Sequence, residues 1–149
     1  MVIQDVELRE IRLSETNLIK EFLFFAGSSL NSFRYFDKRP LTIISNHVIT
    51  VLMFKNNQPI GYGHLDRDHD DVWLGIAISE LMRGRGYGKI LMDYLLKIAK
   101  NKNIKEVRLS VDKVNREAIG LYSYFGFIVS DSGNQSIQIM KLKLVKYGE

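Results

Sequence analysis

The sequence predicts an α/β fold in which one mixed β-sheet is flanked by helices. Three β-rich segments, residues 50–54, 60–65 and 72–78, are joined by short polar turns and come before a glycine-rich turn. The third is almost wholly apolar, which is typical of a central strand covered on both faces. After the glycine-rich turn, helical and strand patterns alternate. We therefore expect an antiparallel section followed by a parallel pair of strands, in a single domain over residues 1–149.

The first 46 residues predict a strand, a helix and a segment without a clear pattern. Residues 6–13 alternate loosely between apolar and charged side chains, which indicates a strand. Ser14 is placed to cap a helix over residues 15–26, which Gly27 would end. A short second helix with loops fits residues 28–46 best.

The elements after the glycine-rich turn follow from the spacing of apolar residues. Residues 89–100 have apolar side chains at helical spacing, and residues 107–111 alternate as a strand does. Asn115 can cap a further helix, which Gly126 would end. Residues 136–144 alternate again and predict a final strand.

The composition excludes several function classes. The chain has no cysteine, which rules out disulfides, thiolate metal sites and cysteine nucleophiles. No His, Asp and Glu cluster has ligand spacing, so we expect no metal. The net charge of +4 favours anionic partners, but the basic residues are dispersed, which disfavours nucleic acid and leaves a phosphorylated cofactor.

The sequence also predicts a cytoplasmic protein that does not act in a membrane. Residues 1–7 lack the basic and apolar regions of a signal peptide. No apolar run approaches the roughly 20 residues that a membrane span needs. The edge strands near the C-terminus could support a dimer, so both a monomer and a homodimer are compatible with the sequence.

The most informative segment is Arg83-Gly84-Arg85-Gly86-Tyr87-Gly88, which joins a buried strand to an amphipathic helix. The first turn of a helix has free backbone N–H groups and partial positive charge, and glycines allow a phosphate to approach them. Lys89-Ile90 follows where a P-loop needs Lys-Ser/Thr, and the spacing is not that of a dinucleotide fingerprint. The segment therefore predicts a pyrophosphate-binding turn, with a tight turn that binds nothing as the alternative.

Two motifs resemble those of the GNAT superfamily of N-acetyltransferases. The spacing Arg83-x-x-Gly86-x-Gly88 resembles its acetyl-CoA signature, and residues 115–127 resemble its N-x-x-A-x-x-L-Y-x-x-x-G-F segment. The resemblance covers residues 72–127 in motif and the remainder in element order; Glu80 stands where many members carry proline. It implies a GNAT-like fold with splayed middle strands, and an enzyme that transfers an acetyl group from acetyl-CoA to a primary amine.

The resemblance also implies roles for individual residues. Main-chain groups of residues 76–78 would hold the pantetheine arm, and one N–H would polarise the thioester carbonyl. The implied cofactor-binding residues are Ile76, Ala77, Ile78, Arg83, Gly84, Arg85, Gly86, Tyr87, Gly88, Lys89, Asn115 and Tyr122. Tyr122 matches the acid that protonates the leaving thiolate, although a core tyrosine is the alternative. Asn115 could act as a helix cap, a cofactor contact or both.

A general base must take a proton from the incoming amine, and His64 and Asp66 are the residues considered for it. His64 and Asp66 lie on one face of a strand if its alternation continues. His64 has the more suitable intrinsic pKa and is the candidate base. A structural histidine is the alternative, in which case a chain of water molecules would remove the proton.

Residues 33–35 bear on the acceptor. Phe33, Arg34 and Tyr35 are candidate substrate-binding residues, because aromatic rings can stack on a sugar or base and arginine can bind phosphate. This combination suits a small molecule such as a nucleotide-linked amino sugar; a helix packed on the sheet is the alternative. A peptide N-terminus or a lysine as acceptor also stays open, as does an acyl-CoA-binding module without catalysis.

Overall fold

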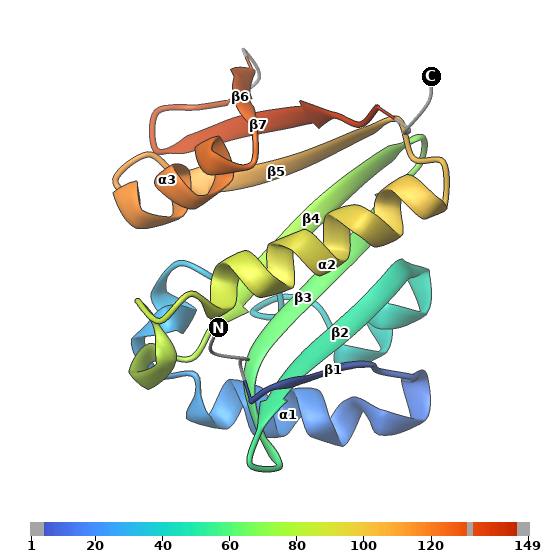
Figure 1. Ribbon diagram of the computed structural model, residues 1–149, viewed down its shortest axis with the longest axis vertical. Helices are drawn as coiled ribbons and strands as arrows, with labels where there is room; N and C mark the ends of the chain where they lie inside the picture. Colours follow the sequence, from blue (N-terminus) through green and yellow to red (C-terminus); the bar gives the residue numbers. More distant parts are fainter. Residues whose placement is uncertain (1–4, 131–132, 146–149) are drawn as a thin grey trace.

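The computed structural model describes residues 5–130 and 133–145, and a seven-stranded mixed sheet runs through them in the order β1-β2-β3-β4-β5-β7-β6 (Figure 1). The strands are β1 (Glu7–Glu10), β2 (His47–Lys55), β3 (Gln58–Asp68), β4 (Asp71–Ile78), β5 (Glu106–Asp112), β6 (Ile128–Ser130) and β7 (Ile137–Lys143). The α-helices are α1 (Thr16–Phe25), α2 (Tyr87–Asn101) and α3 (Arg116–Tyr124), and 3₁₀ helices cover Leu13–Glu15, Gly27–Asn31, Leu41–Asn46 and Glu80–Met82. The predicted α/β class is confirmed.

The sheet has an antiparallel part and a parallel junction, as the order of elements predicts. Strands β1 to β4 are antiparallel neighbours, whereas β4 and β5 are parallel. The pairing of β4 with β5 is confined to Trp73 and Arg108, and the two strands separate beyond that point (Figure 1). Ion pairs of Arg108 reinforce this pairing. Its guanidinium lies 3.4 Å from Asp71 Oδ1 of β4 and 3.2 Å from Glu106 Oε1 of its own strand. The expected splay of the middle strands is therefore present.

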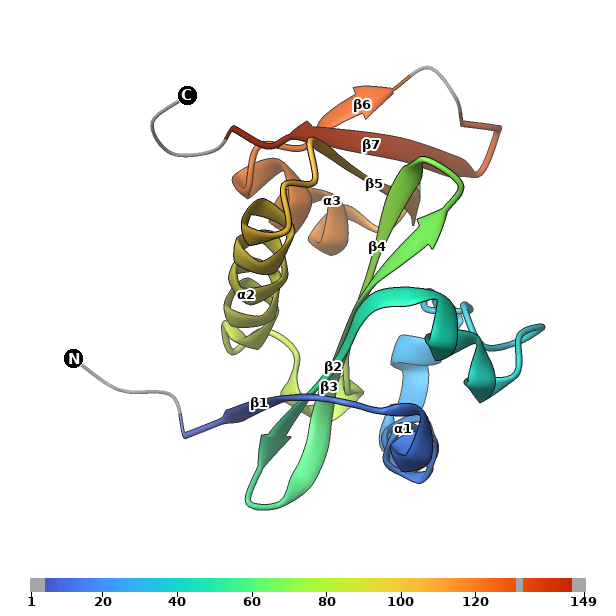
Figure 2. The ribbon, with the colours of Figure 1, turned by 90° about the vertical axis from the view of Figure 1, so that its right-hand side faces the viewer.

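The helices cover both faces of the sheet. Figure 2 shows α2 and α3 on one side and α1 on the other. The larger apolar core lies under α2 and includes Leu91 and Leu95; the second lies under α1 and includes Phe22 and Tyr62. Helix α2 packs closely on β3 because Gly63 has no side chain: a Cβ there would lie 2.8 Å from a methyl group of Leu95.

Three local expectations differ from the structure. Ser14 does not cap α1: the chain enters the helix through a 3₁₀ turn, and the Glu15 carboxylate accepts the Arg12 N–H at 3.0 Å. The predicted first strand over residues 6–13 is shorter, Glu7–Glu10. Residues 28–46 contain two 3₁₀ helices in place of a short α-helix.

The expectations about membranes and targeting fall partly on residues that are not described. In the described ranges, no helix combines the length and the apolar character that a membrane span requires. The absence of a signal peptide was expected from residues 1–7, of which residues 1–4 lie outside the described part.

Candidate active site

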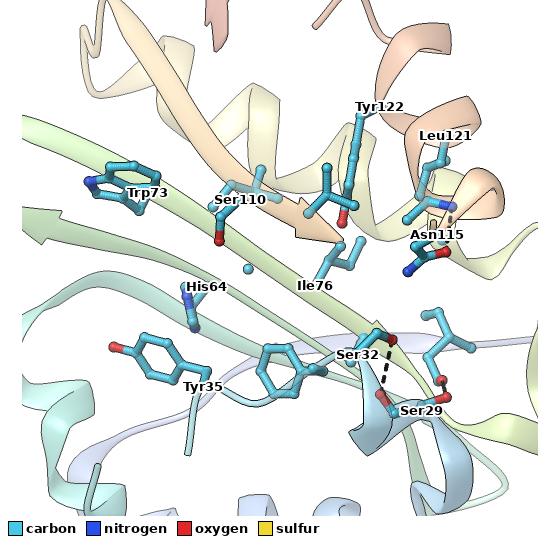
Figure 3. A pocket seen from close by; sticks show the side chains of 18 of the residues that line it. Ser29, Ser32, Tyr35, His64, Trp73, Ile76, Ser110, Asn115, Leu121 and Tyr122 are labelled. Atoms are coloured by element: carbon cyan, nitrogen blue, oxygen red, sulfur yellow. Dashed lines mark hydrogen bonds between the residues drawn. The ribbon is translucent and has the colours of Figure 1, made fainter. Parts of the chain in front are cut away.

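A cleft of about 1110 Å³ opens where β4 and β5 separate. Its walls come from these two strands, the first turn of α2, helix α3 and the segment over residues 29–39. We call the end near the Trp73–Arg108 pair, where β4 and β5 still meet, the closed end; the open end reaches the glycine-rich turn. Figure 3 shows side chains from both strands and from α3 pointing into this space. The cleft thus connects the predicted pyrophosphate site to the predicted acceptor residues.

The glycine-rich turn leaves the start of α2 uncapped by the chain. Gly86 is the N-cap with φ +90°, and Gly84 has φ +75°, a left-handed conformation that glycine adopts without strain. A Cβ on either glycine would meet no atom within 4 Å, so the space beside the turn is open. The helical hydrogen bonds start with Ile90 N–H to Gly86 O at 3.4 Å, so the amides before Ile90 have no helical acceptor. Uncapped amides beside open space fit an anionic group such as a diphosphate.

The basic residues of the turn are placed differently from one another. Arg83 Nη2 donates to Ser28 Oγ at 3.1 Å, and Lys89 Nζ lies 4.1 Å from the ring centre of Tyr124. Arg85 is exposed. The Tyr87 side chain is buried in the core, where its hydroxyl accepts a hydrogen bond from Lys55 at 2.7 Å. Only the backbone of Tyr87 can therefore serve the predicted pyrophosphate site.

Glu80 connects the exit of β4 to the early segment of the chain. Its carboxylate accepts the Ser28 N–H at 2.6 Å, and its own N–H donates to Ala26 O at 3.0 Å. The hydrogen bonds from Ser28 hold the pKa of Glu80 below its usual value. Glu80 thereby connects the exit of β4 to the segment after α1, which forms one wall of the cleft.

Tyr122 and Asn115 both line the cleft. Tyr122 is 7% exposed, and its hydroxyl points toward Ile76 on the opposite wall (Figure 3). Burial raises the pKa of Tyr122, so the phenol stays protonated through the neutral range. Asn115 caps α3, because its Oδ1 accepts the Ala118 N–H at 3.2 Å. The predicted cap is confirmed, and Tyr122 presents a protonated phenol to the cleft.

His64 lies at the closed end of the cleft, above Gly75 of β4. Its ring is 2% exposed, and a Cβ on Gly75 would lie 2.5 Å from its Nε2 atom. The other ring nitrogen, Nδ1, is 2.6 Å from the Tyr62 hydroxyl. Burial first, and then the nearby His47, lower the pKa of His64 well below the usual value. His64 is therefore a neutral imidazole that lines the cleft, with its Nε2 atom beside Gly75.

A second polar chain lies beside His64. Thr50 Oγ1 is 2.7 Å from His47 Nδ1, His47 Nε2 is 2.8 Å from the Tyr35 hydroxyl, and Tyr35 donates to Asp66 Oδ2 at 2.8 Å. Burial lowers the pKa of His47 to about 4. The Tyr35 and His64 rings are 4.3 Å apart between their centres. His64 and Asp66 thus share one face of β3, as the alternation of the strand predicts.

The three predicted substrate-binding residues all line the cleft, in different ways. Phe33 packs on Tyr62, with ring centres 5.2 Å apart. Arg34 forms a bidentate contact with Asp112 at the end of β5, at 2.7 and 3.1 Å. This contact raises the pKa of Arg34 and lowers that of Asp112. It joins the early segment to the far wall of the cleft, and it occupies the guanidinium that the sequence suggested for phosphate.

The comparisons with known proteins agree with this geometry. Residues 14–127 match the model of the Acetyltransferase (GNAT) family. The chain belongs to the GNAT family. No curated protein matches it. Family membership confirms the expected fold and the expected enzyme class, an acetyl-CoA-dependent N-acetyltransferase.

Solved structures share the fold with this GNAT chain at low sequence identity. A GNAT acetyltransferase from Streptococcus pneumoniae is 20% identical, with a TM-score of 0.77, over 94% of this chain and 99% of that one. A putative acetyltransferase from Salmonella typhimurium, solved with its cofactor acetyl-CoA, is 16% identical, with a TM-score of 0.75, over 98% of both chains. The ribosomal-protein-S18-alanine N-acetyltransferase from Escherichia coli is 15% identical, with a TM-score of 0.72, over 97% of both chains.

Several residues of the cleft were missed by the sequence interpretation. Gly75 could have been noticed, because glycine inside an apolar strand often marks a close approach of another group. Trp73, Ser110 and Asp112 give no such signal, since each looks like an ordinary strand residue. Among the described residues, no group of three or more His, Asp or Glu side chains could hold a metal ion.

Proposed function

We propose that this GNAT acetyltransferase moves the acetyl group of acetyl-CoA onto a primary amine of a small molecule, by direct attack while both substrates are bound. The observation that carries the proposal is the single cleft between β4 and β5. An uncapped helix start opens into one end, and a protonated phenol faces its middle. In this proposal the chain acts as a single domain in the cytoplasm, as a monomer or a homodimer.

The residues of the cleft fit the parts of acetyl-CoA. The backbone amides from Gly86 to Lys89 would bind the diphosphate, with charge from Arg83 and Arg85. Beyond Trp73, β4 has no partner on its β5 side, so main-chain groups of residues 76–78 are available there to bind the pantetheine arm, apart from the Ile78 carbonyl, which accepts a hydrogen bond from the Ser29 hydroxyl. The neck of the cleft, between Ile76 and Tyr122, would then receive the thioester sulfur, with the acetyl group on the side of Gly75.

The chain's own groups then support a direct transfer. The two bound substrates are held in one cleft, which converts an encounter into a positioned reaction. The amine nitrogen forms a bond to the carbonyl carbon, and the carbon–sulfur bond breaks. Tyr122 donates its phenolic proton to the leaving sulfur. The amine loses a proton to solvent, and Tyr122 takes up a proton from solvent. No covalent enzyme intermediate is needed, in keeping with a chain that lacks cysteine.

A small acceptor is favoured by how the early segment closes the cleft. The Arg34–Asp112 contact spans from that segment to β5, which restricts the approach of a folded protein surface. Phe33, Tyr35 and Trp73 supply flat walls, which suits a ring-bearing amine such as a nucleotide-linked amino sugar. In the described ranges Arg39 and Arg67 line the cleft without a carboxylate partner, so they, in place of Arg34, would bind a phosphate.

The test is calorimetry of the purified protein with acetyl-CoA, followed by thiol release with a panel of amines. We expect saturable binding of acetyl-CoA and turnover with a nucleotide-linked amino sugar. Absence of binding at millimolar acetyl-CoA contradicts the proposed function. Binding without thiol release for any amine favours a module without catalysis, and turnover confined to peptide N-termini or lysines favours a protein acceptor.

A further inference from the structure

The Tyr62–His64 pair has a consequence for the chemistry of the cleft, because one hydrogen bond determines where the imidazole keeps its proton. Tyr62 is 0% exposed, and in the described part of the chain His64 Nδ1 is the hydrogen-bond partner of its hydroxyl, at 2.6 Å. No buried side-chain oxygen or nitrogen among the described residues is left without a partner. The proton of the Tyr62 hydroxyl therefore has Nδ1 as its acceptor.

The opposite arrangement would leave a buried donor unpaired. If His64 carried its proton on Nδ1 and donated it to Tyr62, the phenolic O–H would point into the apolar core with no acceptor. Burial raises the pKa of Tyr62, so the phenol is not ionised. With Tyr62 donating to Nδ1, a neutral His64 carries its single proton on Nε2. The hydrogen bond between Tyr62 and His64 fixes this tautomer.

The Nε2 atom lies where the acetyl group of the donor is expected. Gly75 and Ser110 are two residues beyond the Trp73–Arg108 pair, at the point where the strands start to separate. His64 Nε2 lies directly over Gly75, which leaves room for it by lacking a Cβ. Figure 3 shows the Ser110 hydroxyl on the opposite strand, facing the same space as His64. A donor whose diphosphate is bound at Gly86 would reach toward this closed end with its thioester.

We infer that His64 is a hydrogen-bond donor to the thioester oxygen, and not the general base. This inference rests on the proposed function. As the amine attacks, negative charge develops on the acetyl oxygen, and an N–H directed at it stabilises that charge. The proton stays on Nε2 throughout, so His64 gains and loses nothing in the transfer. A neutral imidazole is suited to this task, and the low pKa of His64 keeps it neutral.

The surroundings of His64 agree with a donor and not with a proton relay. Tyr62 has no further partner among the described residues, so a proton accepted at Nε2 could not leave through Nδ1. The other titratable groups around the ring are Tyr35 and Arg39 from the early segment and His47 from β2, and Asp66 of β3 accepts the Tyr35 hydroxyl beside them. The hydrogen bonds of Tyr35, His47 and Asp66 form a separate series that begins at Thr50 and does not include His64. Tyr62 is therefore a positioning residue, which acts through the orientation and tautomer of His64.

Two side-chain replacements separate a donor from a base. His64→Gln keeps an N–H donor near the position of Nε2 but cannot take up a proton, whereas His64→Leu removes both functions at similar size. With acetyl-CoA and the best amine of the panel, we expect His64→Leu to lose about 10²-fold in kcat, as expected for one oxyanion donor. His64→Gln should keep kcat within about tenfold of the wild type, since an amide N–H restores part of that stabilisation. His69→Gln, at an exposed histidine paired with Asp68, is the matched control and should change nothing.

The distribution of the loss identifies the oxygen that His64 contacts. A thioester oxygen is common to every reaction, so His64→Leu should lower kcat by the same factor for all amines of the panel. Equal losses in the Gln and Leu variants, recovered at high pH, would assign a base and overturn the inference. A loss seen only in the KM of particular amines would place the contact on the acceptor and would also overturn it.

NMR of the imidazole nitrogens tests the tautomer without any turnover. In the wild type we expect the proton on Nε2 of His64, and in Tyr62→Phe a mixture of the two tautomers with a lower kcat and an unchanged affinity for acetyl-CoA. A proton found on Nδ1 in the wild type overturns the inference, whatever the activity. Failure of the proposed function is distinguishable, because it shows as absent acetyl-CoA binding in the wild-type calorimetry.

Discussion

The open end and the closed end of the cleft are built from the chain in different ways. At the open end, the strand, the glycine-rich turn and the start of α2 follow one another in sequence. At the closed end, Tyr35, His47 and His64 come from separate segments and meet only because the sheet brings them together. The open end uses backbone groups that glycine exposes, whereas the closed end uses buried polar side chains. The first should therefore respond to backbone changes, and the second to changes in protonation.

The largest expected effect tests the middle of the cleft, where the two ends meet. Tyr122→Phe removes the acid but keeps the packing, so kcat should fall about 10²-fold while the affinity for acetyl-CoA is largely unchanged. Burial raises the pKa of Tyr122, so the phenol keeps its proton at alkaline pH. The wild-type kcat should therefore stay constant on the alkaline side at least up to the usual pKa of a tyrosine. Steady-state kinetics across pH and calorimetry measure both. Unchanged turnover across pH would remove Tyr122 from the mechanism.

An intermediate effect tests the backbone character of the open end. At φ +90°, Gly86→Ala imposes a left-handed strain of about 1–2 kcal/mol, which the turn can relieve only by moving its amides. The Kd for acetyl-CoA should therefore rise about tenfold. Gly126→Ala is the matched control, with φ +96° at a site outside the cleft. Calorimetry should show both variants less stable to heat and only Gly86→Ala weaker in binding; an equal loss of affinity in both would contradict the backbone-based site.

The smallest expected effect concerns the closed end and the stability of the fold. Burial lowers the pKa of His47 to about 4, well below the pKa of an imidazole in water. Below the ordinary histidine pKa of 6.5 the unfolded protein takes up a proton that the native protein does not, so stability falls as the pH decreases from 6.5 to about 4. The contribution of His47 is fully present above this window.

Thermal unfolding across that window measures the contribution of His47. His47→Gln should make the melting temperature less dependent on pH between 6.5 and about 4, and His69→Gln, at an exposed site, should leave the wild-type dependence. His64 adds to the same trend in both variants, because its pKa is lowered too. If the melting temperatures of His47→Gln and the wild type fall in parallel, the buried His47 imidazole does not cause the loss of stability at low pH.

The same contrast explains what could be predicted from the sequence. The glycine-rich turn and the Asn115 cap were predictable because each depends on residues close together in the chain. The series of hydrogen bonds that links Thr50, His47, Tyr35 and Asp66 depends on the register of β2 with β3. This register pairs Thr50 with His64 and His47 with Asp66. A register can shift by one residue without a clear change in the sequence pattern. The Ser14 prediction was wrong because a carboxylate three residues from Arg12 competes for the same turn.

The distance in sequence between contacting residues also limited the prediction of the acceptor end. Arg34 was assigned to an anionic ligand because a sequence does not reveal that Asp112, 78 residues away, binds its guanidinium. Glu80 similarly contacts Ser28 across 52 residues. These contacts depend on the folding of the early segment over the sheet edge, for which residues 28–46 have no helical or strand pattern.

The single point of contact between β4 and β5 has a consequence for rigidity. The two parts of the sheet are joined by one residue pair, Trp73 with Arg108, and past that pair the facing edges of β4 and β5 do not pair with each other, although each strand keeps its partner on the other side. A molecule bound between β4 and β5 supplies hydrogen-bond partners to the facing edges of both strands and so helps to hold the two parts of the sheet together. Binding in the gap should therefore slow amide hydrogen exchange in both parts of the sheet, and the ligand-bound protein should be more rigid than the free protein.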